Sequence, residues 1–271
     1  MHRAFNIPGL IGLAAGLIGV TALAAERNGG TPVTLRELTT DRPDATESPF
    51  TVDRDHLQLE MSVTSYTQDR FEGVRLTEWE LAPFNLRYGI AANVEAGIFI
   101  VPHRRVTVQP RDEPKHERSG VGDTTLRLKV NFWGNDGGPT AFGMMVDVKL
   151  PTAANGMGTG HTDGALTFPI AYELGGGWAG AAMTSVEMVR VDARRRPVWV
   201  NTITFARDLF ADTGGFLELT SAVGEGAHVA TFNCGVTRAL GPRLQLDCGV
   251  NIGISRTAPD LTVFAGLARK F

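Results

Sequence analysis

The sequence predicts an all-β protein, a closed antiparallel transmembrane β-barrel of about twelve strands. Three observations predict this fold. Apolar and polar residues alternate in segments of about ten residues, the connections between segments alternate in length, and aromatic residues gather beside the shorter connections. The 32 glycines, with many Val, Thr, Phe and Leu residues, favour strands and turns over helices.

The first 25 residues are expected to be a targeting segment. His2 and Arg3 precede an apolar run, and Ala22 and Ala24 have the spacing of small residues that a signal peptidase requires. Pro8 and several glycines interrupt the run, which is short for a membrane span; a retained anchor helix is the alternative. The expected domains are a signal peptide at 1–25, a periplasmic N-terminal segment that could plug the lumen at 26–54, and the barrel at 55–271.

The composition excludes several other classes of protein. The formal net charge is −3, and no basic face or arm indicates a nucleic-acid partner. The 2 cysteines are too few for a disulfide-framed secreted domain. After the targeting segment, no apolar stretch reaches the roughly 18 residues of a transmembrane helix.

Alternation defines the strands. In "HLQLEMSVT", Leu57, Leu59, Met61 and Val63 alternate with polar residues, and the pattern recurs in "GDTTLRLKVNF" and "RLQLDCGVNIGI". Such a strand has one face for lipid and one for the lumen. The expected strands are roughly 55–66, 75–90, 93–102, 120–133, 139–151, 164–174, 178–190, 198–207, 214–222, 228–238, 243–254 and 260–271.

The connections between these strands alternate in length. Short "IAAN", "GNDGG" and "GGG" alternate with longer "TQDRFEG", "PHRRVTVQPRDEPKHERSG", "PTAANGMGTGHTD" and "DARRRP". This asymmetry is typical of outer-membrane barrels, which have short periplasmic turns and longer extracellular loops. With both termini in the periplasm, the longer connections fall outside the cell.

The aromatic residues indicate a membrane interface. Tyr88, Phe132, Tyr172 and Trp178 share the apolar phase of their strands and lie near short connections, as a girdle would. Aromatic residues of an ordinary β core are the alternative. Phe271 ends an alternating segment at the same rim and is the expected contact for the barrel-assembly machinery.

Five stretches carry a family resemblance. They are "TTDRPDATESPFTVDRDHLQLEMS", "LRYGIAANVEAGI", "GVGDTTLRLKVNFWG", "VDVKLPT" and "RLQLDCGVNIGISRTAPDLTVFAGLARKF", in that order over residues 39–271. Together they resemble the outer-membrane barrels of the phenol meta-pathway, or transporter-like, family. The resemblance implies a barrel and the transport of small, often aromatic, compounds.

The polar phase of the strands predicts the lining of the lumen. Acidic and basic residues interleave along it, and ionisable groups inside a membrane protein mark a functional site by default. A salt-bridged interior with a purely structural role is the alternative. The expected lining residues are Glu60, Glu78, Glu80, Arg87, Glu95, Asp123, Arg127, Lys129, Asp147, Lys149, Glu218 and Asp247.

The polar stretch "TDRPDATESP" precedes the first strand, and its two prolines argue against a strand there. It could enter the periplasmic mouth of the barrel or remain a solvated leader, and the family resemblance favours a plug. The expected plug residues are Asp41, Arg42, Asp44 and Glu47.

Cys234 and Cys248 fall on consecutive strands joined by "RALGPR". Each is seven residues from Gly241, so a tight hairpin centred there would place them opposite one another on the lipid-facing side. We expect a close pair that could form a disulfide; two small apolar residues packed against lipid are the alternative.

We expect a channel or transporter-like barrel for uptake of small compounds, aromatic or hydrophobic ones among them. A structural or receptor-like barrel with a blocked lumen is the alternative, and a surface hydrolase is a remote one. His161 and Asp163 in a loop lack further metal ligands, and no nucleophile, base and orienter come together. The expectation is therefore no catalytic residue, no metal and no cofactor. The expected partners are outer-membrane lipid, the assembly machinery and a small solute.

Overall fold

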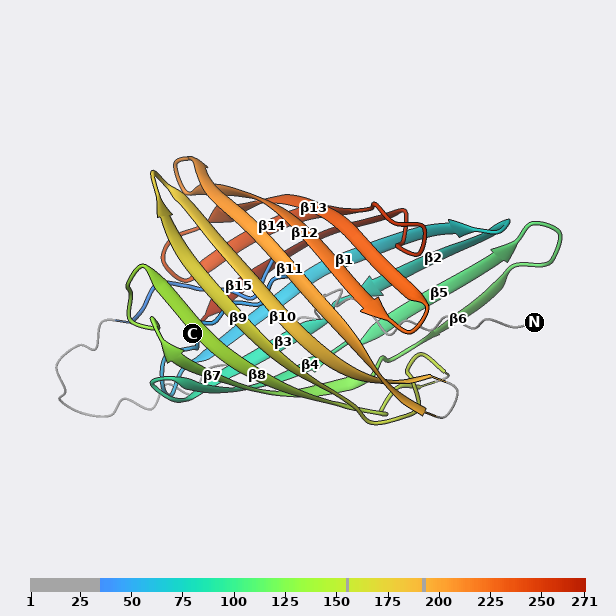
Figure 1. Ribbon diagram of the computed structural model, residues 1–271, viewed down its shortest axis with the longest axis horizontal. Coiled ribbons are helices and arrows are strands. Elements are labelled where there is room, and N and C mark those ends of the chain that lie inside the picture. Colours follow the sequence, from blue (N-terminus) through green and yellow to red (C-terminus); the bar gives the residue numbers. More distant parts are fainter. Residues whose placement is uncertain (1–34, 155, 192–193) are drawn as a thin grey trace.

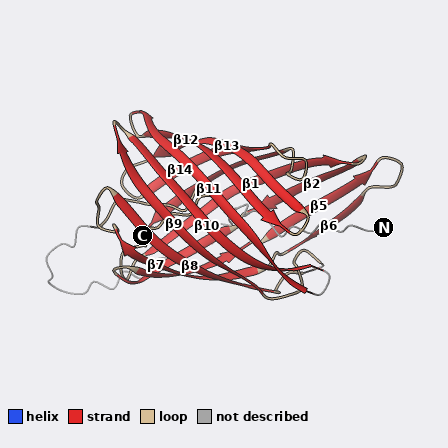
Figure 2. Cartoon of the chain, in the orientation of Figure 1, coloured by secondary structure: helices blue, strands red, loops and turns tan. Residues whose placement is uncertain are grey.

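The chain folds as a closed antiparallel β-barrel (Figure 1). The computed structural model describes residues 35–154, 156–191 and 194–271, so the expected signal peptide lies outside the described residues. β15 (Leu261–Lys270) pairs with β1 (Leu57–Phe71) and closes the wall. Figure 2 shows strands and loops throughout the described chain. Within that part, no helix is long and apolar enough to cross a membrane.

Twelve strands form the wall, because three of them are each interrupted once and the described chain has fifteen strand segments. The predicted twelve-strand barrel is confirmed. The interrupted strands are β2 (Val74–Leu81) with β3 (Phe84–Ala91), β4 (Val94–Ile100) with β5 (His103–Pro110), and β6 (His116–Gly120) with β7 (Thr124–Trp133). The others are β8 (Thr140–Leu150), β9 (Asp163–Gly175), β10 (Trp178–Val191), β11 (Arg194–Phe210), β12 (Thr213–Gly224), β13 (Ala227–Ala239) and β14 (Leu244–Gly253).

The interruptions lie side by side, because β2 pairs with β5 while β3 pairs with β4. Pro83 and Pro102 stand at two of them, and proline has no N–H to donate to a neighbouring strand. Ala82 has a φ of 63°, which also takes the backbone out of the extended conformation. Beyond these breaks, β6 pairs only with β5 among the described strands.

Three of the predicted long loops are wrong. Most of "PHRRVTVQPRDEPKHERSG" forms the hairpin of β5 and β6, and "TQDRFEG" is the end of β1 followed by a tight turn at Glu72 and Gly73. In "DARRRP", residues 194–197 belong to β11. Proline residues conceal the strand pattern in the first case. The connection at 151–162 is long, as predicted.

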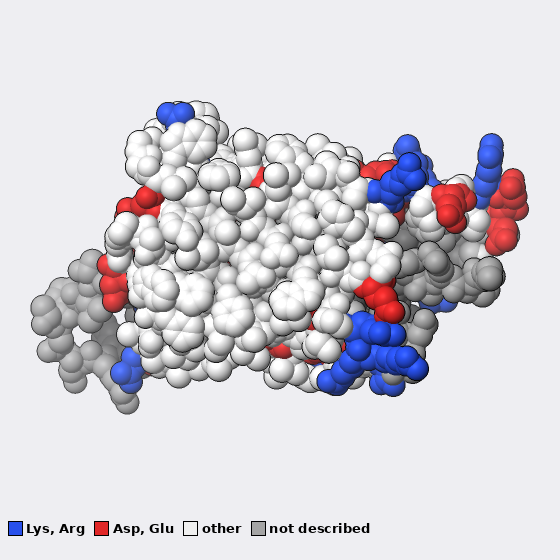
Figure 3. Space-filling view, in the orientation of Figure 1, with Lys and Arg blue, Asp and Glu red and all other residues white. Residues whose placement is uncertain are grey.

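Apolar side chains cover the outside of the barrel. Figure 3 shows a broad band with very few charged residues, while most Lys, Arg, Asp and Glu residues lie at its two ends. Leu126 on β7 and Leu217 on β12 are 46% and 52% exposed, whereas Lys129 and Glu218 on the same strands are buried. This inside-out distribution is that of a barrel surrounded by lipid.

The predicted aromatic girdle residues are all exposed near one end of the barrel. Tyr172 and Trp178 flank the turn from β9 to β10, and Phe132 lies just before the turn from β7 to β8. Tyr88 stands near the turn from β3 to β4, and Phe271 donates its backbone N–H to Leu57 at the start of β1. We call this the terminal end of the barrel.

The predicted facing pair of cysteines is wrong. Cys234 pairs with Val250, and Cys248 pairs with Val236, so the two thiols are offset by two positions and both are free. The turn from β13 to β14 is centred one residue later than the count from Gly241 assumed. A one-residue change in the centre of a hairpin moves each partner by two places.

Candidate functional site

Residues 35–56, here called the inner segment, form no strand and run inside the barrel (Figure 1). Hydrogen bonds join the segment to side chains of β1, β3, β4, β7, β11, β12, β14 and β15. Glycines in the wall make room for it. A Cβ on Gly89 would lie 2.1 Å from the carbonyl oxygen of Asp53, and one on Gly266 would lie 2.1 Å from Nη2 of Arg42.

Asp41 is the centre of the charged contacts. Its carboxylate accepts a hydrogen bond from Nζ of Lys129, and it lies 3.4 Å from Nη1 of Arg87 and 3.7 Å from Nη1 of Arg127. The four side chains are at most 10% exposed. β3 and β7 supply the three cations, and both strands pair with β4, so the pairing of these neighbouring strands brings the cations together.

Wall carboxylates balance these cations and also bind the inner segment. Arg87 donates two hydrogen bonds to Glu95, at 2.8 and 2.9 Å, and another to Glu60. Glu60 accepts the backbone N–H of Asp41 at 3.0 Å, and Glu95 accepts that of Val52 at 2.7 Å. Each carboxylate therefore joins a wall arginine to the backbone of the segment.

The opposite wall holds the same segment through Asp247 and Glu218. Arg42 donates to both carboxylate oxygens of Asp247, at 2.6 and 3.0 Å, in the bidentate geometry that is strongest for this pair. Glu218 accepts the backbone N–H groups of Ala45 and Thr46, at 3.0 and 2.7 Å. Buried charges without such partners would cost several kcal/mol.

The remaining two expected plug residues also contact the wall. Glu47 lies 2.7 Å from Nη2 of Arg127, which in turn donates two hydrogen bonds to Asp147 at 2.8 Å. Asp44 lies beside Thr204 of β11 and Glu218 of β12. All four expected plug residues thus lie among expected lining residues of the strands.

Lys270 ties the inner segment at the terminal end. Its ammonium donates to the carbonyl oxygens of Arg36 and Glu37, at 2.9 and 3.2 Å, and to Asp53 at 3.0 Å. Arg36 also donates to Asp53, at 2.7 Å. Burial raises the pKa of Asp53, but the hydrogen bonds from Arg36 and Lys270 outweigh it and hold that pKa below its usual value.

Four expected lining residues lie farther from the inner segment. Glu78 accepts two hydrogen bonds from Arg104 of β5, at 2.8 and 2.7 Å, and Glu80 lies 3.8 Å from the same guanidinium. Sequence reasoning missed Arg104 because it assigned that residue to a loop. The alternation of Val106 and Val108 with Arg105, Thr107 and Gln109 would have indicated the strand.

Asp123 and Lys149 hold the long connection at 151–162. The carboxylate of Asp123 accepts backbone N–H groups of this connection, at 3.1 and 3.0 Å. Lys149 forms an ion pair with Asp163 at 2.7 Å, where β9 begins. These contacts fasten the connection at the end of the barrel opposite the terminal end.

Part of the β10–β13 side of the lumen is apolar, although Thr202, Glu218 and Thr220 are also buried on that side. Val200 lies two residues from Thr202, whose hydroxyl bonds to Thr46 of the inner segment, and the sulfur of Met183 accepts the backbone N–H of Glu47. The charged wall of β1, β3, β4 and β7 lies across the segment from it. The members of this apolar wall are Met183, Val198, Val200, Ala222 and Val229 of β10–β13, with Ala258 from the β14–β15 connection.

One histidine lies beside a serine on the outer surface of the barrel. Nε2 of His228 lies 3.1 Å from Oγ of Ser221 on the outer faces of β12 and β13. Within the described residues, no side chain bonds the other ring nitrogen, so a third member of a catalytic set is missing there. The described chain also has no cluster of three or more His, Cys, Asp or Glu placed to hold a metal ion.

Comparisons with known proteins agree with this architecture. An outer membrane channel from Pseudomonas putida F1 is 14% identical with a TM-score of 0.60, covering 82% of this chain and 97% of that one. The β domain of the Bordetella autotransporter BrkA is 13% identical with a TM-score of 0.55, covering 81% and 100%. A search of curated proteins found no match.

These structural likenesses show the fold. A family model described as "Putative MetA-pathway of phenol degradation" matches residues 40–271, which include the described inner segment from residue 40 onward and the entire barrel. The chain belongs to this family.

Proposed function

We propose that the protein is an outer-membrane channel for uptake of small apolar compounds, aromatic ones among them. The apolar wall carries this proposal. Charged residues on both sides of the lumen hold the inner segment, while the apolar wall lines a part of the lumen without them. An apolar solute can contact such a wall without stripping water from charged groups, which would be costly.

The outer surface supports the outer-membrane location. An apolar band with exposed aromatic residues fits a bilayer, and the short turns at the terminal end would then face the periplasm. We propose removal of the signal peptide, and recognition by the barrel-assembly machinery through Phe271, whose exposed ring lies 5.0 Å from the Arg269 guanidinium. The family description, which names phenol degradation, supports aromatic compounds as solutes.

Passage requires the inner segment to shift, since it occupies the lumen. The test compares the full chain with a version lacking residues 35–50. We expect low single-channel conductance for the full chain and a large increase for the shortened one. Intact cells that produce the full chain should accumulate radiolabelled phenol faster than cells without it, while glucose accumulation stays the same.

A structural barrel with a blocked lumen is the second candidate, favoured by the many buried ion pairs that fix the inner segment. It predicts neither conductance nor phenol uptake in the full chain. Absence of both in the shortened version too, when that version still shows the heat-dependent gel migration of a folded barrel, would contradict the channel.

A further inference from the structure

A polar surface lies on the outer faces of β1, β2 and β5, where these strands extend beyond the apolar band (Figures 1 and 3). Leu81, on the outer face of β2, is 47% exposed. Two residues farther out, Tyr66 and Trp79 are cross-strand partners with ring centroids 4.6 Å apart. Polar side chains follow beyond this pair. Aromatic residues in this position mark the boundary between lipid tails and headgroups.

Exposed cations lie beyond the aromatic pair, where Arg75 donates a hydrogen bond to Gln68 at 2.8 Å. Arg70 and Arg75 are direct cross-strand partners, and like charges in that position repel each other. Among the described residues, no carboxylate lies within ion-pair distance of Arg70, Arg75 or Arg111. Lys115 pairs with Glu117 at 3.1 Å but remains 57% exposed. An anion bound between these cations would relieve the repulsion.

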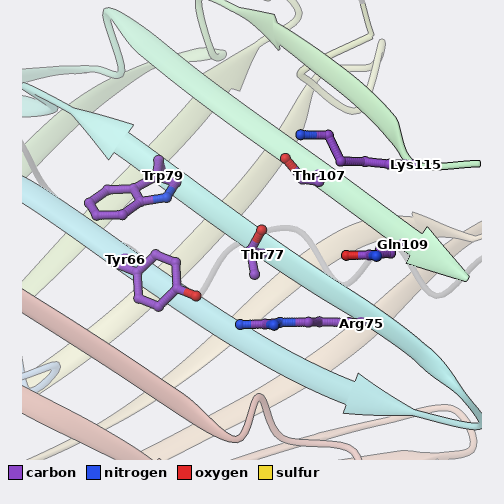
Figure 4. A pocket seen from close by; sticks show the side chains of 7 residues that line it. All are labelled: Tyr66, Arg75, Thr77, Trp79, Thr107, Gln109 and Lys115. Carbon is purple, nitrogen blue, oxygen red and sulfur yellow. The ribbon is translucent and has the colours of Figure 1, made fainter. Parts of the chain in front are cut away.

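A shallow depression of about 330 Å³ connects the aromatic and cationic residues. Figure 4 shows the Arg75 side chain extending toward Tyr66, with Thr77 on the same strand as Arg75. Trp79 and Lys115 line the same depression, so an aromatic wall and two cations face one space. A second depression of about 350 Å³ continues from Arg75 to Arg70 and Arg111, with Glu72 as the one acidic residue among three arginines of its lining.

We propose that this surface binds the phosphorylated headgroup of lipopolysaccharide in the outer leaflet. Guanidinium groups bind phosphate through paired hydrogen bonds, and basic pockets beside a bilayer bind anionic headgroups. Tyr66 and Trp79 would contact the sugar rings, and Leu81 the acyl chains. Free phosphate offers the same anion but neither of these contacts. The proposal rests on the outer-membrane location given under the proposed function.

The test measures binding to the purified full chain by the change in tryptophan fluorescence. The probes are lipopolysaccharide, the same lipopolysaccharide after enzymatic removal of its phosphates, and inorganic phosphate. The variants are Arg75→Glu and the milder Lys115→Ala. Arg256→Glu is the matched control, because Arg256 is an exposed arginine in the connection between β14 and β15.

We expect Arg75→Glu to weaken binding of lipopolysaccharide about tenfold or more, Lys115→Ala to weaken it about fivefold, and Arg256→Glu to leave it unchanged. Removal of the phosphates should weaken binding to the wild-type chain to a similar degree. Equal affinity for the dephosphorylated lipid, equal affinity in folded Arg75→Glu, or equally tight binding of inorganic phosphate would overturn the proposal. The binding assay measures no transport. Its result therefore does not depend on whether the barrel conducts ions or takes up phenol.

Discussion

Arg42 and Asp247 meet in the lumen although 205 positions separate them in the sequence. Their side chains are 4% and 0% exposed, so each charge depends on the other for solvation. Gly266 stands beside them because any larger residue would occupy the place of the Arg42 guanidinium. At this scale, the position of the inner segment is decided by a few buried groups.

Replacing Asp247 by Asn should release this part of the inner segment. The substitution leaves Arg42 buried without a carboxylate, which costs about 3–5 kcal/mol when one partner of a buried pair is lost. Amide hydrogen exchange at residues 41–47 should rise, and channel openings should become more frequent. Asp136→Asn is the control, because Asp136 is 86% exposed and 3.7 Å from Arg36. Equal exchange in both variants would contradict the assignment.

Gly266→Ala should destabilise the same contact. Its Cβ would lie 2.1 Å from Arg42 and 2.3 Å from the carbonyl oxygen of Met61, so side chain and strand must both move. Overpacking of this kind costs about 1–3 kcal/mol. The melting temperature in detergent should fall. Gly164→Ala, whose Cβ would have its nearest neighbour at 3.5 Å, should melt within a degree or so of the wild type.

Low pH should weaken the contacts that hold the inner segment at the terminal end, because Asp53 becomes protonated. Its pKa is below the usual value in the folded chain, so its contribution is fully present above about pH 4 and is lost as pH falls through the lowered pKa. We expect amide protection at residues 36–40 to decrease below about pH 4. Asp53→Asn should abolish this acid-dependent step and show weak protection already at pH 7.

At the scale of the element, alternation predicted most strands because one face meets lipid and the other does not. It failed at β5 and β6, where Pro102 and Pro110 hide a strand that the pairing with β2 stabilises. Counting residues from Gly241 also did not predict the register of β13 and β14, because the residues of a turn do not by themselves fix where its centre lies. Local pattern determines which face a residue occupies, while pairing determines its neighbours.

The connection at 151–162 gives a prediction at this scale. Asp123→Asn should free it, because the neutral amide offers one acceptor oxygen to the two backbone N–H groups that the carboxylate binds. Limited proteolysis should then cut the connection faster, by about tenfold for a loss of roughly 1.4 kcal/mol. Asp112→Asn, in the exposed β5–β6 turn, is the matched control. An unchanged cleavage rate would contradict the role of Asp123.

At the scale of the whole molecule, the barrel is charged inside and apolar outside. The sequence predicted this division and many of the charged residues, because strand periodicity separates the two faces. It could not predict which charges meet. Asp41 finds Lys129, Arg87 and Arg127 only through the path of the inner segment, and the tie of Lys270 to Asp53 spans almost the full described chain.

Removing residues 35–50 should make the open barrel cation-selective. Arg87, Arg127 and Lys129 would then remain beside Glu60, Glu95 and Asp147, while Glu218 and Asp247 would lose their partners in the segment. The remaining lumen would carry excess negative charge, which favours cations. The reversal potential in a potassium chloride gradient measures this, and preference for chloride would contradict the charge arrangement.

The tie between Lys270 and the inner segment has a consequence for assembly. Lys270 belongs to β15, the strand that completes the wall by pairing with β1, and its ammonium holds Arg36, Glu37 and Asp53. These residues are synthesised long before Lys270. They acquire this contact only when the last strand has taken its place beside the first. The step that closes the barrel is therefore also the step that fixes this part of the inner segment in the lumen.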